Sequence, residues 1–385
     1  MAEYAIQVSN GLTEGGVAPS AKHFPGHGDT YVDSHLALPV IKKIERELHG
    51  MELIPFRALI EAGVATIMTG HMALPLVVAE DDKETPCSCS RTVTTELLRQ
   101  QLGFKGVIVT DCLEMEAVAG KYTTQKGAVL SLRAGADVAM ICHTMGVQTG
   151  AIEETYKAVE RGELSLAALR ESGVRIDELK RQFAGTWETV FAELDEEGLA
   201  EVVGANAKLS KRAYGASTAV IKEPLPEGKP GPVLVLTPEM ESVNKAVDDA
   251  DEESTAGAHY IAFAASVRAR RKDMQHIVYS RLPGPENEIP DGVIAALRQD
   301  VHPARLIFVT RNADRSVWQV EYLRRLRRHV PLETAVVVLA SCNPYDLEGA
   351  PDIDYACVAS FEYTAAALDA AVDVVLGDMK TRGRE

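Results

Sequence analysis

The sequence predicts an α/β protein built from two domains, and two observations support this prediction. Short apolar runs typical of buried strands alternate with longer helical patterns along most of the chain, as in parallel β/α units. A Pro- and Gly-rich run, EPLPEGKPGP at residues 223–232, interrupts this alternation and is typical of a linker. We therefore expect one domain over residues 1–183, a linker over 184–231 and a second α/β domain over 232–385.

The first domain repeats one theme, in which an apolar run leads into a polar or Gly-containing loop and then into a helical pattern. Its candidate strands are residues 18–24, 65–69, 106–110 and 138–142. Helical patterns are expected at 44–62, 94–102 and 148–183. Four such units make half of the common eight-stranded barrel. The predicted fold is therefore the C-terminal half of a (β/α)8 TIM-type barrel followed by a smaller α/β sandwich domain, and on this interpretation the chain lacks the first half of the barrel.

The second domain shows the same alternation over a shorter span. Strands are expected at residues 233–236, 276–279, 306–310 and 335–340, with a helix at 317–328. The acidic segment 241–256 has few large apolar residues and is interpreted as a surface helix or a mobile loop. The basic run at 268–272 is interpreted as a solvated helix face.

Composition limits the classes of partner. The chain has 385 residues, 46% of them hydrophobic, so it can bury a sizeable core. Its formal charge of -16 disfavours nucleic acids and anionic membrane surfaces, since both need clustered Lys and Arg. The first residues lack the basic start and apolar run of a signal peptide, and no apolar run is long enough to span a bilayer. We expect a cytoplasmic location, and the sequence does not indicate the oligomeric state.

The six cysteines are scattered, and the one close pair, Cys87 and Cys89, lacks a second cluster that would complete a zinc site. We therefore expect neither a metal nor a cofactor. Cys112, Cys142 and Cys342 lie in or beside apolar runs, where a free thiol behaves as a small hydrophobic side chain. This use of cysteine is typical of a reducing compartment.

The densest group of polar side chains follows the first candidate strand. The run KHFPGHGDT at residues 22–30 leads into Asp33, Ser34 and His35, so that three His, one Lys and two Asp lie within fourteen residues. Its Pro-Gly and Gly-His-Gly steps leave the backbone free to bend, which favours a loop that builds a site over an incidental polar loop. Asp33 and His35 are two residues apart and can meet, and the carboxylate would then fix the imidazole tautomer and raise its pKa, as suits a proton donor.

Asp111 directly follows the third candidate strand. A carboxylate at the carboxyl end of a parallel strand faces the mouth of the site, where it can act as a nucleophile or stabilise a developing oxocarbenium ion. The same side chain can instead cap a helix that begins at Cys112. The pattern alone does not decide between these two interpretations.

Three motifs occur in a diagnostic order: KHFPGHGDTYVDSHLALP, IMTGHMALP and VIVTDCLEMEAV. Together they closely resemble glycoside hydrolase family 3, and specifically its β-N-acetylglucosaminidase branch. The resemblance runs from residue 17 to about residue 180, and SCNPYDL at 341–347 looks like that branch's C-terminal α/β domain. The Asp-Ser-His loop separates this branch from the family's β-glucosidases, which take their acid from a glutamate elsewhere.

The resemblance implies a role for each matching residue. Asp111 matches the nucleophile that forms a covalent glycosyl-enzyme, and His35, paired with Asp33, matches the general acid/base. The implied activity is that of a retaining, exo-acting enzyme that removes terminal β-linked N-acetylglucosamine from an oligosaccharide or smaller substrate.

The same resemblance implies substrate contacts. Lys22 and His23 match positions that hydrogen-bond sugar hydroxyls. His71 either lines the same pocket or packs behind it.

Two features leave alternatives open. A neutral His35 would not repel an incoming anion, so phosphate could replace water and the reaction would be phosphorolysis. The family also takes an Asp and an Arg from strands that precede the one at Lys22, and this sequence begins after them. A truncated chain with little activity, or a regulatory sugar-binding homologue, is therefore an alternative. An unrelated small-molecule-binding scaffold is disfavoured because the chain carries no Gly-rich phosphate loop.

Overall fold

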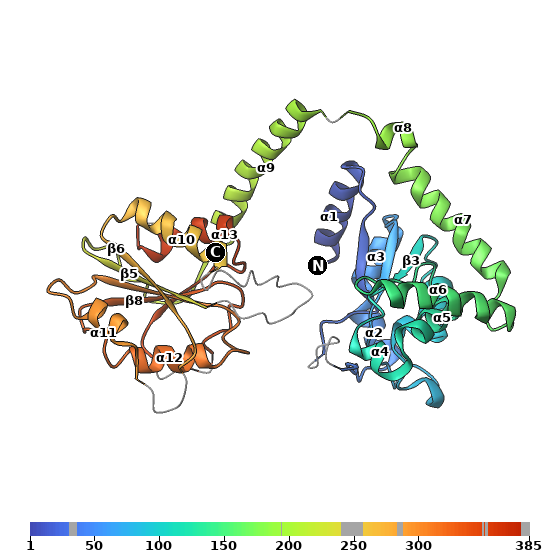
Figure 1. Ribbon diagram of the computed structural model, residues 1–385, viewed down its shortest axis with the longest axis horizontal. Helices are drawn as coiled ribbons and strands as arrows, with labels where there is room; N and C mark the ends of the chain where they lie inside the picture. The colour runs from blue at the N-terminus through green and yellow to red at the C-terminus, as the bar shows by residue number, and fades with distance from the viewer. Residues whose placement is uncertain are drawn as a thin grey trace. The chain divides into compact units, whose positions relative to one another are not determined.

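The computed structural model describes residues 1–30, 37–193, 195–239, 257–282, 288–348, 350 and 353–378. The predicted acid/base pair Asp33 and His35 and the acidic segment 241–256 lie outside these residues. The chain divides into two compact units, Met1–Glu193 and Leu194–Glu385 (Figure 1).

The first unit contains a three-stranded parallel sheet in the order β1-β2-β3, with β1 at Ser20–Phe24, β2 at Thr66–Thr69 and β3 at Val107–Thr110. The predicted fourth strand at 138–142 pairs with β3 only through a single parallel bridge between Val109 and Val138. The residues after Val138 do not continue the pairing with β3, because their main-chain N–H groups donate to side chains instead. The Met140 N–H, for example, donates to the Thr110 hydroxyl. The predicted half-barrel order is thus present, with a much shorter fourth strand than expected.

Helices cover this sheet in the order that the sequence predicts, with different boundaries. The expected helix at 44–62 is two helices, because Met51 and Glu52 interrupt it, and the expected helix at 148–183 breaks around Gly162, whose φ is +71°. The segment expected as a helix at 94–102 is the π-helical η3. The helical elements are α1 (Ala2–Glu14), α2 (Glu45–Gly50), α3 (Leu53–Glu61), η1 (Glu80–Asp82), η2 (Cys87–Cys89), η3 (Thr92–Gln101), α4 (Glu116–Tyr122), α5 (Thr124–Ala134), α6 (Met145–Glu160), α7 (Leu166–Phe183) and α8 (Trp187–Val190).

The core of the first unit holds the strand ends in place. Phe24, Ile67 and Ile108, one from each strand, are fully buried. The ring of Phe24 packs edge-on against Phe56 of α3, with 5.2 Å between the ring centroids. Each such side chain contributes about 1.5–3 kcal/mol of burial free energy. This packing fixes the height at which each strand ends and therefore the positions of the polar residues that follow.

The second unit is a six-stranded sheet in the order β4-β9-β8-β7-β5-β6, in which only β4 is antiparallel to its neighbour. Buried side chains of α10 and α13 belong to one core cluster, and those of α11 and α12 belong to another that contains the alternate residues of the same strands. The unit is therefore an α/β sandwich, as predicted. Its elements are α9 (Glu196–Ser217), β4 (Ala219–Lys222), β5 (Val233–Pro238), α10 (Gly257–Arg270), β6 (Met274–Tyr279), α11 (Asp291–Leu297), β7 (Arg305–Thr310), α12 (Trp318–Leu326), β8 (Ala335–Ala340), β9 (Ala356–Ala359) and α13 (Ala365–Val375).

The span that the sequence suggests as a linker, 184–231, contains regular secondary structure. This span contains α8 and α9, and β4 joins the second sheet by pairing with β9. No residue of α9 is buried, and its apolar residues Leu199, Val202, Val203 and Leu209 are exposed. The strand β4 is short and lies at the sheet edge, where backbone pairing needs little apolar signal. Among the described residues, no helix is long and apolar enough to cross a bilayer.

Candidate active site at the carboxyl ends of the strands

The predicted site residues of the first unit gather at one edge of its sheet. Lys22 and His23 stand near the end of β1, His71 follows β2 and Asp111 follows β3. Main-chain hydrogen bonds hold these segments side by side beyond the strands: the Gly70 N–H donates to the Phe24 carbonyl and the Asp111 N–H to the Thr69 carbonyl, each at 2.9 Å. The carboxyl ends of parallel strands share one edge, so these residues lie along the same edge of the sheet.

Asp111 is a half-buried carboxylate with each oxygen in a different environment. Its Oδ1 accepts a hydrogen bond of 2.8 Å from the Cys112 main-chain N–H, and its Oδ2 lies 3.6 Å from Nε2 of His23. The side chains of His23 and Asp111 are 30% and 19% exposed, so both remain accessible. The next helix, α4, has Met115 as its N-cap, so Asp111 does not cap it. The capping interpretation is therefore excluded, and Oδ2 is the oxygen available for chemistry.

His71 is buried, and it uses both ring nitrogens inside the protein. Its Nε2 lies 2.9 Å from the Cys112 carbonyl and its Nδ1 2.7 Å from the Ser88 hydroxyl. A carbonyl can only accept, so the proton is on Nε2 and the Ser88 hydroxyl donates to Nδ1. Burial lowers the pKa of His71, and the Cys112 carbonyl and the Asp111 charge only partly oppose this. Of the two alternatives for His71, the geometry favours the one in which it packs behind the pocket, because both ring nitrogens bind groups of the protein.

The side chains expected to bind sugar hydroxyls lie along an open groove. Lys22 is exposed, and the ring of His23 packs edge-on against that of His27 with 6.0 Å between the centroids. Nδ1 of His27 lies 2.8 Å from the Thr30 hydroxyl. All three cationic or imidazole side chains border a groove of about 1020 Å³ that follows α1, β1 and the loop at 26–29. Asp111 is not among the described residues that line this groove, but His23, which does line it, lies 3.6 Å from the Asp111 carboxylate.

Sequence reasoning missed Lys43, which ties this loop to the body of the unit. Its ammonium pairs with Asp29 of the loop at 3.0 Å and with Glu52 at the start of α3. Hydrogen bonds to Glu52 and then Asp29 raise the pKa of Lys43. The three residues are far apart in sequence and form no recognisable motif, so only the fold brings them together.

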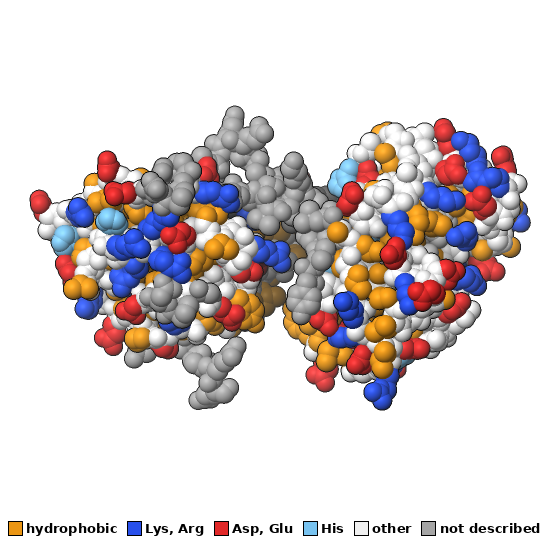
Figure 2. Space-filling model, turned by 90° about the horizontal axis from the view of Figure 1, so that it is seen from below, with side chains coloured by type: hydrophobic (Ala, Val, Ile, Leu, Met, Phe, Trp, Pro, Cys, Tyr) orange, Lys and Arg blue, Asp and Glu red, His pale blue; other side chains and the backbone are white. Residues whose placement is uncertain are grey.

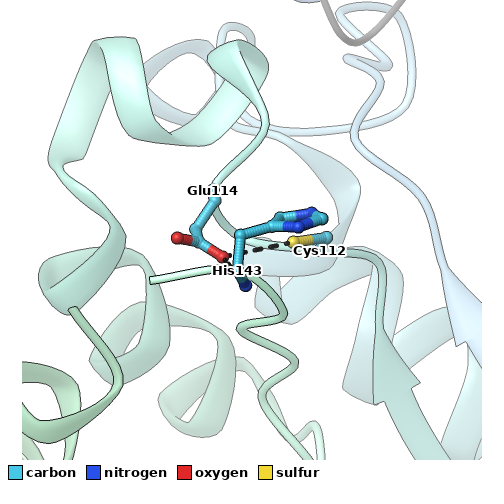
Figure 3. Close-up of side chains that lie close together, drawn as sticks. All are labelled: Cys112, Glu114 and His143. Atoms are coloured by element: carbon cyan, nitrogen blue, oxygen red, sulfur yellow. Dashed lines mark hydrogen bonds between the residues drawn. The ribbon is translucent and has the colours of Figure 1, made fainter. Parts of the chain in front are cut away.

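Glu114 was also not singled out, although it organises the loop beside Asp111. Its carboxylate accepts main-chain hydrogen bonds from Cys142, His143 and Thr144 at 2.9, 2.7 and 3.1 Å. Burial opposes ionisation, but these hydrogen bonds outweigh it and lower the pKa of Glu114. Figure 3 shows the side chains of Cys112, Glu114 and His143 close together. The available sequence signal was its place three residues after Asp111, on the loop at a strand end.

Comparison with known proteins shows which family and which relatives the chain resembles. Residues 1–179 match the family model of the glycosyl hydrolase family 3 N terminal domain. A β-hexosaminidase from Neisseria meningitidis serogroup B is 38% identical over 143 residues, which are 37% of this chain and 38% of that protein. The match thus spans about two fifths of the length of this curated relative.

Two solved structures share the fold over nearly the whole chain. A glycoside hydrolase family 3 β-N-acetylglucosaminidase from a Paenibacillus species is 28% identical with a TM-score of 0.82, over 98% of this chain and 69% of that one. A fungal multi-domain enzyme of the same description is 32% identical with a TM-score of 0.82, over 100% of this chain and 42% of that one. These matches confirm the predicted fold class, an incomplete TIM-type barrel followed by an α/β domain. Residues 1–179 are therefore similar to the N-terminal domain of glycoside hydrolase family 3.

Proposed function

We propose that the protein is a retaining, exo-acting β-N-acetylglucosaminidase in which Asp111 is the nucleophile. The observation that carries the proposal is the asymmetric setting of this carboxylate at the end of β3. One oxygen is held by the Cys112 N–H, and the other faces His23 in a partly exposed position. The similarity to β-hexosaminidases and β-N-acetylglucosaminidases supports the choice of sugar.

The chemistry follows the two-step scheme of retaining glycosidases. Oδ2 of Asp111 attacks the anomeric carbon, and the leaving oxygen takes a proton from the acid, which forms a covalent glycosyl-enzyme. Water then attacks the same carbon while the same group accepts its proton, the bond between the sugar and Asp111 breaks, and the two inversions together retain the configuration. The acid/base in the proposal is His35 paired with Asp33, and this assignment rests on the sequence resemblance.

The surrounding residues prepare Asp111 for attack. The Cys112 N–H binds Oδ1 and leaves Oδ2 facing His23, while His71 holds the carbonyl of Cys112, the residue that follows Asp111. His23 and Lys22 are proposed to donate hydrogen bonds to sugar hydroxyls, which would place the anomeric carbon near Oδ2. We further propose that the substrate is an oligosaccharide or smaller molecule that ends in N-acetylglucosamine. The proposed location is the cytoplasm.

Hydrolysis by the purified chain tests this proposal. 4-Nitrophenyl N-acetyl-β-glucosaminide should be cleaved in preference to 4-nitrophenyl β-glucoside, and Asp111→Asn should lower kcat by at least about 100-fold, since the mutant loses the covalent step. With Asp111→Gly, added azide should restore turnover and yield the α-glycosyl azide, because azide then attacks from the side that the carboxylate occupied. A β-glycosyl azide, or equal hydrolysis by the wild type and Asp111→Asn, would contradict the proposed role. Running the reaction in phosphate separates hydrolysis, which releases N-acetylglucosamine, from phosphorolysis, which releases its 1-phosphate.

A further inference from the structure

We propose that Cys112, Glu114 and His143 form a binding site for one soft divalent cation, with Zn²⁺ as the best-fitting ion. A thiol sulfur, a carboxylate oxygen and an imidazole nitrogen from these residues all lie within 4.8 Å of one another. Cys112 and Glu114 come from the loop after β3, and His143 comes from the loop before α6 (Figure 3). The two loops are held together by Glu114, so the ligands converge before any metal binds.

The distances require only a small movement to reach zinc geometry. Tetrahedral Zn²⁺ with one sulfur ligand and nitrogen or oxygen ligands sets its donor atoms about 3.3–3.6 Å apart, from bond lengths of about 2.0–2.3 Å. The Cys112 Sγ and Glu114 Oε2 are already 3.9 Å apart. His143 is exposed, so its ring can turn inward without disturbing the core. The main-chain hydrogen bonds to Glu114 are the kind of outer support that ligating carboxylates have.

The donor set selects the class of cation. Thiolate and imidazole ligands favour Zn²⁺ and other soft or borderline ions over Mg²⁺ and Ca²⁺, which prefer oxygen ligands. When the Zn–S bond forms, the Cys112 thiol gives its proton to the buffer and the ion gives up bound water, with no change of oxidation state. Thiolate and carboxylate together balance the charge of the ion. Three protein ligands leave a fourth position open, and Cys142, whose thiol interacts with that of Cys112, lies beside it.

The site adjoins the proposed nucleophile. Cys112 follows Asp111 directly, and its N–H binds the Asp111 carboxylate. A dication held by the Cys112 sulfur would stabilise the Asp111 charge and weaken its attack on the sugar, so Zn²⁺ should inhibit turnover. This consequence rests on the proposed function, whereas the binding itself does not.

Metal titration of the full chain tests the site. After treatment with a chelator and dialysis, the wild type should bind one equivalent of Cd²⁺ that produces a thiolate-to-metal absorption band, and Zn²⁺ should displace it. Cys112→Ser should abolish the band, and His143→Ala should weaken binding at least about 10-fold, as even the loss of outer support does in metal sites. His143→Ala is the more informative variant, because its main-chain bond to Glu114 remains and folding is preserved. Cys342→Ser and His329→Ala, in the second unit, serve as matched controls that keep full affinity.

Three outcomes would overturn the assignment: no thiolate band in the wild type, a band that survives in Cys112→Ser, or unchanged affinity in His143→Ala. Hydrolysis gives a separate readout. Zn²⁺ should inhibit the wild type reversibly and His143→Ala much less. If the chain binds Zn²⁺ without any change in turnover, the link to Asp111 is refuted while the site stands; if no variant hydrolyses the substrate, the proposed function fails and the metal titration still decides the site.

Discussion

Replacing His71 with alanine removes the side chain that holds the Asp111 segment in place. The wild-type imidazole makes one buried and one partly buried hydrogen bond, each worth about 1 kcal/mol net. Truncation also removes this partner from the buried Ser88 hydroxyl and from the carbonyl of the half-buried Cys112, at about 1–3 kcal/mol. We therefore expect His71→Ala to lower the free energy of unfolding of the first unit by about 3–5 kcal/mol.

Urea denaturation followed by circular dichroism measures this loss, and hydrogen exchange read by mass spectrometry assigns it to peptides of the first unit. His329→Ala, a histidine in the second unit, is the control and should leave these peptides unchanged. In the hydrolysis assay, His71→Ala should lower kcat more than it raises KM, because it displaces the nucleophile without touching substrate. A stability loss below about 1 kcal/mol together with an unchanged kcat would refute the role given to His71.

The same residue gives a pH prediction whose sign is fixed by the structure. Because the folded-state pKa of His71 lies below its ordinary value of 6.5, the unfolded chain binds more protons at acidic pH. The neutral imidazole therefore contributes stability above pH 6.5, and that contribution is lost as the pH falls from 6.5 through the lower folded-state pKa. The stability gap between wild type and His71→Ala should be largest near neutral pH and narrow on acidification. A gap that widens at low pH would mean that the imidazolium is the favoured buried form.

Two further predictions concern carboxylates that hold segments of the first unit together. Asp137 has a fully buried side chain that pairs with Arg99 and Arg175. Asp137→Ala should therefore destabilise the first unit by about 3–5 kcal/mol in urea denaturation, and the exposed Asp177→Ala on α7 is the control; a loss below about 1 kcal/mol would contradict the buried network. Glu114→Ala should expose the main-chain N–H groups of residues 142–144 to faster hydrogen exchange, and Glu114→Gln should retain part of the protection; unchanged exchange in both variants would show that Glu114 does not hold the loop.

Strand ends were the most predictable part of the site. The apolar run at 106–110 predicted β3, and the rule that parallel strands end at one edge then placed Asp111 near His23, as the 3.6 Å separation shows. The role of His71 could not be settled from sequence, because IMTGHM shows a histidine after a strand but not whether its ring turns toward the groove or toward Cys112. The ring turns toward Cys112 and is buried there, and such burial depends on the packing of the whole unit.

Other features depend on contacts that sequence patterns do not encode. The cation site joins Cys112 and His143 across 31 positions, so no short ligand spacing exists to be recognised. The position of β4 depends on backbone pairing at a sheet edge, where side chains are only partly buried. The helix expected over 44–62 is interrupted at Met51 and Glu52, and Glu52 forms an ion pair with Lys43. In each case the deciding interaction joins residues that are distant in sequence or involves the backbone alone.

Trapping of the covalent intermediate tests the central claim, that Asp111 is the nucleophile. A fluorinated N-acetylglucosamine derivative with a good leaving group should react once and accumulate on the enzyme, because fluorine slows both steps while the leaving group speeds the first. We predict that the intact protein gains the mass of one sugar, that the peptide containing Asp111 carries it, and that Asp111→Asn gains nothing. A label on another residue, or turnover of the reagent by Asp111→Asn at the wild-type rate, would contradict the account.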